Sequence, residues 1–195
     1  VSSEDAGDAG DAANTNGTWL IAGFDELAAK VPGCIPFDRN TDPELLGELL
    51  SHAQERGLPF SGVVWRAASP SPSPSPEESS ADDSSAGASA AVSARVENEI
   101  ANLLSAVHTV QSGSQNGAVK LPNGLWIITE RAVACESGEP VDPVQAALWG
   151  FGRTTINEEP ALRCKLVDSD GSPEAVRLLA GLLSTPTEEP ELALR

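Results

Sequence analysis

The segment Gly138–Asp170 constrains the fold more than any other stretch, because it reads as a helix that leads directly into a strand. Asp142 is a favourable N-cap residue, and Pro143 stands at the first helical position, where a missing N–H costs nothing. Gln145, three residues after the cap, completes a capping-box pattern. A Glu-Glu-Pro sequence then stops the helix, and alternating apolar and basic residues over 162–166 predict a strand.

One side of this helix is predicted to be buried against a sheet. The side chains on that side recur at helical spacing, at Val144, Ala147, Leu148, Phe151 and Thr155. Gly150 and Gly152 lie inside the helix, where small residues would let it pack close to the strands. We therefore expect the helix to lie directly on a sheet.

The rest of the chain repeats the same alternation of strand and helix. Apolar runs suited to strands occur at 18–22, 35–37, 60–65, 125–129 and 162–167, and stretches with helical spacing or helix-start signals separate them. None of the connections carries a hairpin signal. The sequence therefore predicts an α/β fold, with a mostly parallel sheet of about five strands and helices on both faces.

Composition divides the chain into one interrupted lobe and its flanks. Residues 1–16 are small and acidic and read as a flexible linker. The lobe begins over 17–66 and resumes over 95–186, because neither part is large enough to fold alone. Between them, 67–94 is rich in Ser, Pro and Ala and is predicted to be a disordered insertion. Residues 187–195 read as a tail that leads to a downstream domain.

The formal net charge of −17 argues against nucleic acid and anionic membranes as partners, because both require positive potential. Cys34, Cys135 and Cys164 are widely spaced and odd in number, which favours free thiols in a reducing cytoplasm. No apolar run approaches the roughly 18 residues of a membrane span.

No part of the sequence carries a recognisable catalytic, cofactor-binding or metal-binding site. The first strand-to-helix turn, Ala22–Glu26, has one glycine and two carboxylates instead of a dinucleotide fingerprint. Tyrosine is absent, so the proton donor of a short-chain reductase is missing. His52 and His108 have no ligand-spaced neighbours and are expected at the surface, and Cys164 is expected to be a buried structural thiol.

Two stretches, GLWIITERAV and EPVDPVQAALWGFGRTTINEEPALRCKLVDSD, carry a more specific pattern. Over Leu125–Asp170 the chain closely resembles the structural subdomain of the ketoreductase in modular type I polyketide synthases. That family shows LW-(I/L)-(V/I)-T, then DP-x-QAALWG-x-GR and L-R-C-x-L-V-D. Earlier segments, TWLIAGFDELAAKVPGCIPFD and FSGVVW, match more loosely but in order. The insertion at 67–94 departs from the compact family pattern.

The resemblance implies a truncated Rossmann-like lobe that lacks cofactor and catalytic residues and braces a second, catalytic lobe. That partner lobe would hold NADPH and reduce the β-keto group of acyl chains bound to a carrier protein. An enoylreductase can be inserted between the two lobes, and the parent multienzyme is expected to be a cytoplasmic homodimer. Within this lobe, Trp149 or Arg153 is a candidate to face the partner, and the alternative is that Trp149 belongs to the core.

Two other functions stay open on the sequence. A free-standing small-molecule-binding or reducing α/β protein would show NADPH affinity and turnover by itself. An adaptor would use its Ser/Pro tract as a docking peptide. The resemblance favours the structural lobe over both.

Overall fold

The computed structural model describes residues 17–40, 43–57, 59–69, 84–115, 120–185 and 187–195. Six strands form one sheet in the order β2-β1-β3-β4-β5-β6, and every neighbouring pair is parallel. The strands are β1 (Thr18–Ala22), β2 (Ile35–Phe37), β3 (Phe60–Arg66), β4 (Leu125–Glu130), β5 (Lys165–Ser169) and β6 (Glu191–Leu194). The helices are α1 (Asp25–Ala28), α2 (Pro43–Glu55), α3 (Ser84–Gln115), α4 (Pro143–Glu158) and α5 (Pro173–Ser184), with a 3-10 turn at Pro160–Leu162.

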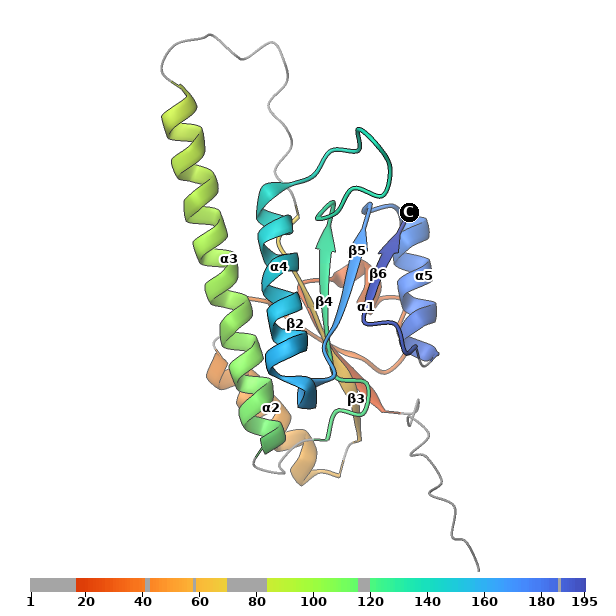
Figure 1. Cartoon of the computed structure of the whole chain (residues 1–195). Coiled ribbons are helices and arrows are strands. Elements are labelled where there is room, and N and C mark those ends of the chain that lie inside the picture. The colour runs from red at the N-terminus through yellow and green to blue at the C-terminus, as the bar shows by residue number, and fades with distance from the viewer. Residues whose placement is uncertain (1–16, 41–42, 58, 70–83, 116–119, 186) are drawn as a thin grey trace, which may run out of the picture.

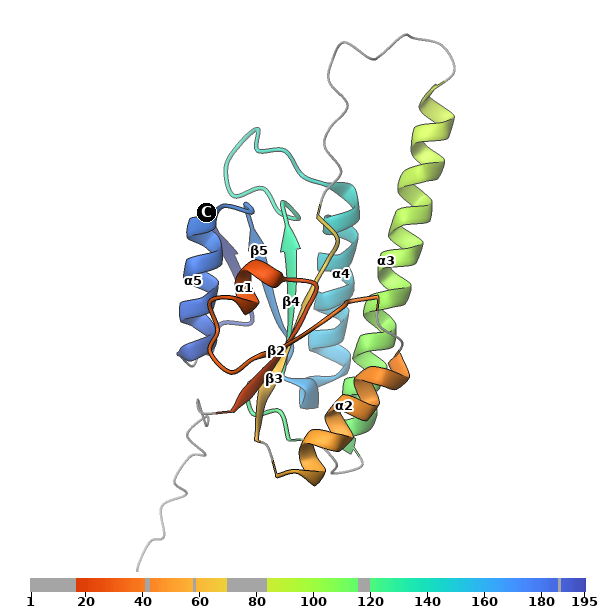
Figure 2. The same ribbon diagram turned by 180° about the vertical axis from the view of Figure 1, so that it is seen from behind.

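The helices cover both faces of the sheet, as expected. Figure 1 and the reverse view in Figure 2 place α2, α3 and α4 on one face and α1 and α5 on the other. β4 shows why both faces are covered, because Leu125 and Ile127 join the core beneath α2–α4, whereas Trp126 and Ile128 join the core beneath α1 and α5. The predicted α/β Rossmann-like fold is thus confirmed, with an all-parallel sheet.

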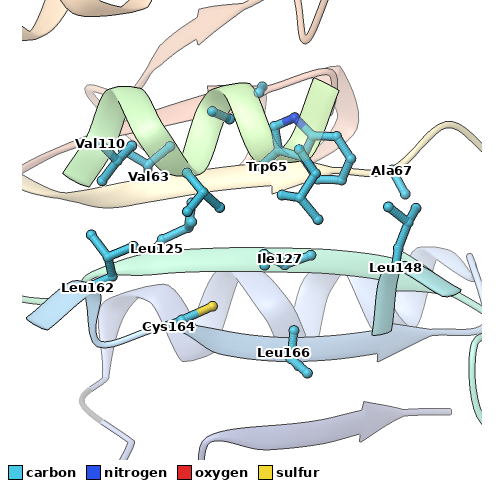
Figure 3. Close-up of a cluster of buried hydrophobic side chains, with 14 of the residues drawn as sticks. Val63, Trp65, Ala67, Val110, Leu125, Ile127, Leu148, Leu162, Cys164 and Leu166 are labelled. Atoms are coloured by element: carbon cyan, nitrogen blue, oxygen red, sulfur yellow. The ribbon is translucent and has the colours of Figure 1, made fainter. Parts of the chain in front are cut away.

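The larger core lies between the sheet and the α2–α3–α4 layer. Figure 3 shows part of it, with labelled side chains from the strands and the residues next to them, from α3 and α4 and from the 3-10 turn: Val63, Trp65, Ala67, Val110, Leu125, Ile127, Leu148, Leu162, Cys164 and Leu166. On α4, Gly152 faces this core so closely that an added Cβ would lie 2.2 Å from Leu166 Cδ2. The expected close approach of α4 to the sheet is therefore confirmed at Gly152, whereas Gly150 is exposed.

Three boundaries differ from the sequence-based expectations. Residues 191–194, expected in a tail, form β6, so the sheet has six strands instead of about five. Two parts of the expected disordered insertion at 67–94 are ordered, because Ala67 is buried in the larger core and residues 84–94 form the start of α3. The linker at 1–16 and residues 70–83 of the insertion lie outside the described residues. Leu162 lies in the 3-10 turn, so β5 begins only at Lys165.

The structure decides whether Trp149 faces a partner lobe or belongs to the core. Trp149 is 6% exposed and lies in the larger core, so the hypothesis that it faces a partner lobe is wrong. Arg153 is exposed, and its Nε and Nη2 atoms lie 2.9 and 2.6 Å from the carboxylate oxygens of Glu191 on β6.

Among the helices that the structure describes, none is long and apolar enough to cross a membrane.

Candidate functional site at the carboxyl end of the sheet

Sheet topology selects one place where a ligand would be expected. β2 pairs with one side of β1 and β3 pairs with the other, so the direction of the crossovers reverses at β1. In open parallel sheets, ligands bind outside the carboxyl ends of the strands at such a switch point. The residues that follow β1, β2 and β3 are therefore the candidate site.

Arg66, the last residue of β3, fills one part of this site. Its guanidinium carbon lies 4.2 Å above the ring centroid of Phe24, just after β1. Its Nη2 atom lies 3.1 Å from Glu130 Oε2, and its Nη1 atom lies 3.8 Å from Glu26 Oε2. The aromatic ring and the carboxylates hold the guanidinium, whose side chain is 18% exposed, across the ends of β1, β3 and β4.

A second ion pair lies beside the first. Arg39, after β2, directs Nη1 at both carboxylate oxygens of Glu99, at 2.8 and 2.7 Å. Glu99 lies in the middle of α3, and its Oε2 atom also accepts a 3.1 Å hydrogen bond from Ala68 N, just after β3. The carboxyl ends of β2 and β3 are thereby tied to α3.

Gln145 ties α4 to the same end of the sheet. The carboxylate of Asp142 caps α4 as predicted, accepting from Val144 N at 2.8 Å and Gln145 N at 3.0 Å. The buried Gln145 side chain points elsewhere: its Oε1 atom accepts from Glu130 N at 3.1 Å, and its Nε2 atom donates to Ala68 O. The predicted reciprocal half of the capping box is therefore wrong, because Gln145 serves the sheet instead of the helix terminus.

Asp168 organises the loop between β4 and α4. The side chain is fully buried, and its Oδ1 atom accepts from Thr129 Oγ1 at 2.8 Å and from Ala132 N at 2.7 Å. Its Oδ2 atom accepts from Arg195 Nη2 at 3.0 Å. Arg195 also reaches Glu139, and the N–H groups of Cys135 and Glu136, together with Arg195, lower the pKa of that carboxyl.

The two histidines and Cys164 take no part in the contacts described above. His52 and His108 are exposed, as predicted. Cys164 is buried, as predicted, and burial raises the pKa of its thiol to about 12. Within the described residues, no group of three or more His, Cys, Asp or Glu side chains could hold a metal ion.

A cavity of about 490 Å³ lies at the opposite, amino end of the sheet, beside Trp19, Trp126, Arg163 and Lys165. The Lys165 amine donates to the carbonyl oxygens of Thr187 and Glu189, and burial lowers its pKa. Arg163 Nη1 donates to Pro122 O at 3.0 Å. These contacts give both cations a role in holding the walls of the cavity.

The sequence profile of one protein family matches residues 37–195, which is most of the chain: the Rossmann fold domain of the polyketide synthase extender module SpnB. The chain belongs to this family. The resemblance inferred from Leu125–Asp170 is confirmed, since the chain is a structural Rossmann-like subdomain of a modular polyketide synthase ketoreductase.

Curated relatives of this ketoreductase subdomain include polyketide synthases. The chain is 39% identical over 80 residues to erythronolide synthase EryA3 of Saccharopolyspora erythraea. The aligned residues make up 40% of this chain and 2% of that protein. It is 46% identical over 72 residues to the spectinabilin polyketide synthase system protein NorB of Streptomyces orinoci, covering 36% and 3%. The ketoreductase subdomain therefore spans a small fraction of each relative.

Solved structures agree on the fold. A C2-type ketoreductase from a modular polyketide synthase superposes with a TM-score of 0.61 at 22% identity, covering 92% of this chain and 38% of that chain. The Pseudomonas aeruginosa RhlG/NADP active-site complex superposes with a TM-score of 0.57 at 11% identity, covering 92% and 94%. At these identities the likeness concerns the fold alone.

Sequence reasoning missed the residues that organise the carboxyl end. Arg39 and Glu99 are 60 positions apart, and Asp168 and Arg195 are 27 apart, so spacing along the chain could not pair them. Only Gln145 carried a signal, its fixed place in the DP-x-Q pattern, and that pattern was assigned to helix capping.

Proposed function

We propose that this subdomain is a non-catalytic brace for the catalytic ketoreductase subdomain of the same polyketide synthase. That partner binds NADPH and reduces the β-keto group of an acyl chain on a carrier protein. This subdomain contributes no catalytic, cofactor-binding or metal-binding residue. Its role is to hold the partner in its folded, active form through protein–protein contact.

The observation that carries the proposal is the occupied switch point. Arg39, Arg66 and Phe24 fill the space above the ends of β1–β3. The turn after β1 places Asp25 and Glu26 in the first turn of a four-residue helix, where their charges would repel a pyrophosphate. These residues do not fit a dinucleotide, although the sheet has the corresponding topology.

The partner is proposed to contact the α2–α3–α4 layer. Exposed large apolar side chains among the described residues include Leu45 on α2, Leu104 on α3 and Val141 just before α4, whereas α5 contributes Leu178. Exposed Gly150 on α4 has no atom within 4 Å of an added Cβ, so another helix could approach closely there. A protein interface with an apolar centre fits this face better than the α5 face.

Two glycine variants test which layer is covered. Gly150→Gln on α4 and Gly181→Gln on α5 both add bulk where the chain itself leaves open space. We expect Gly150→Gln to weaken the affinity for the separately produced catalytic subdomain about tenfold, which corresponds to roughly 1.4 kcal/mol. Gly181→Gln should leave the affinity, measured by titration calorimetry, unchanged. The opposite result would contradict the assignment of the α2–α3–α4 layer.

The brace itself is tested by activity of the recombined pair. The catalytic subdomain alone should oxidise NADPH slowly with a β-ketoacyl thioester, and addition of this chain should raise both its rate and its thermal midpoint. This chain alone should neither bind NADPH nor turn it over. NADPH binding by the isolated chain, or no effect on the catalytic subdomain, would refute the proposal.

A further inference from the structure

The Glu99 carboxylate lies in a set of hydrogen-bond donors of the kind that proteins use for bound oxyanions. Arg39 Nη1 contacts both oxygens, at 2.8 and 2.7 Å, and Ala68 N donates to Oε2 at 3.1 Å. A guanidinium and a backbone N–H that donate to the same group are common ligands for carboxylate and phosphate. Glu99 is 4% exposed, so these donors replace the water around its charge.

The position of these donors is the position of a ligand in this type of sheet. Arg39 follows β2 and Ala68 follows β3, and these strands flank β1 at the switch point. The Arg39 side chain crosses the end of β1 so closely that a Cβ on Gly23 would lie 2.9 Å from Arg39 Cδ. Gly23 has φ of +63°, which glycine tolerates best. The donors therefore converge from both sides of the switch point.

The donors are held by contacts that do not involve Glu99. Gln145 Nε2 donates to Ala68 O, on the peptide unit that follows the Ala68 N–H, and so holds Ala68 in place, while Oε1 of the same side chain accepts from Glu130 N. The aliphatic part of Arg39 rests on Gly23. Because these contacts do not involve Glu99, we expect Arg39 and Ala68 to keep their positions when its carboxylate is removed. Such pre-organisation distinguishes a binding site from an ordinary ion pair.

We propose that Arg39, Ala68 N–H and Gly23 form an oxyanion cradle whose occupant is the chain's own Glu99. The Glu99 side chain, delivered by α3, takes the place that a small carboxylate or phosphate would otherwise take. A second anion is excluded because Glu99 fills the cradle and balances the charge of Arg39. This inference rests on contacts within the chain and is independent of the proposed brace function.

Chemical rescue tests the cradle. In Glu99→Ala the donors lose their partner, and acetate should bind in place of the missing carboxylate. We expect the thermal midpoint of Glu99→Ala to fall below that of the unaltered chain and to rise by about 2–4 °C in sodium acetate relative to sodium chloride at equal ionic strength and pH 7. The unaltered chain should show the same midpoint in both salts.

Two variants separate binding at the cradle from general salt effects. Glu97→Ala removes an exposed carboxylate from the same helix and should show no acetate-specific change. Arg39→Ala combined with Glu99→Ala removes the main donor and should abolish the acetate effect. If Glu99→Ala does not fold in chloride, refolding yield in the two salts becomes the readout. Absence of an acetate gain in both midpoint and yield overturns the proposal, as does an equal gain in the double variant.

Discussion

At the scale of single residues, contact distance explains why two glycines two positions apart on α4, and so on opposite sides of the helix, have different roles. Gly152 faces the core, where an added Cβ would lie 2.2 Å from Leu166 Cδ2, and Leu166 is fully buried and cannot move into solvent. Gly150 faces outward with no atom within 4 Å of an added Cβ. The sequence Gly150-Phe151-Gly152 therefore contains one glycine that packing requires and one that packing within the chain does not require.

Alanine at each position should change stability in opposite directions. Gly152→Ala should lower the free energy of unfolding by about 1–3 kcal/mol, because the core must shift to admit the methyl group. Gly150→Ala should raise it by about 0.5–1 kcal/mol, because alanine reduces the entropy of the unfolded chain and favours the helix. Urea denaturation of the two variants measures both effects. Equal effects would show that α4 does not lie on the sheet as described.

At the scale of secondary-structure elements, α4 is positioned by its first turn. Asp142 caps the helix, and Gln145 joins that turn to the ends of β3 and β4 through Ala68 O and Glu130 N. The Asp142 side chain accepts hydrogen bonds only from the first turn of α4, whereas the Gln145 side chain fixes α4 relative to the sheet. The two residues should therefore differ in their tolerance of isosteric change.

Two isosteric variants measure this difference. Asp142→Asn keeps a capping oxygen and should change the free energy of unfolding by less than about 0.5 kcal/mol. Gln145→Glu loses the donor to Ala68 O and buries a charge beside that carbonyl, so it should destabilise the chain by about 2–3 kcal/mol near pH 7. Chemical denaturation provides the measurement. A neutral Gln145→Glu would mean that the side chain does not bridge helix and sheet.

The elements that could be predicted from sequence are those with strong local patterns. The continuous apolar run of β4 indicated a strand covered on both faces, and the capped, proline-started α4 began where expected at Pro143. The start of α3 was missed because its first residues are mostly Ser and Ala, a composition assigned to disorder although alanine favours helix. β6 was missed because four residues next to charged neighbours give almost no periodic signal.

At the scale of the whole molecule, the carboxyl ends of the strands form a continuous set of polar contacts. Arg39, Arg66, Gln145 and Asp168 each join segments that are distant in the sequence. The sequence could exclude a dinucleotide fingerprint in the first turn, but it could not show what fills this end instead. Those contacts depend on which strands become neighbours, and strand order follows from tertiary packing that no local pattern encodes.

The contacts of Arg195 offer a test of how the carboxyl end of the sheet is held together. Arg195, directly after β6, donates to Asp168, Glu139 and Val133 O, so it fastens the loop between β4 and α4 to β5. Arg195→Ala leaves the buried Asp168 without its cation and should lower the free energy of unfolding by about 1.5–3 kcal/mol.

The matched control for Arg195→Ala is Arg177→Ala, because Arg177 pairs with Glu174 on the exposed side of α5, where both side chains are more than half exposed. Exposed pairs of this kind contribute about 0–1 kcal/mol, so this variant should be close to neutral. Hydrogen exchange should show faster exchange at Val133 and Cys135 in Arg195→Ala only, since Arg195 helps to hold the loop that contains them. Unchanged exchange at these amides would mean that Asp168 and Glu139 order the loop without Arg195.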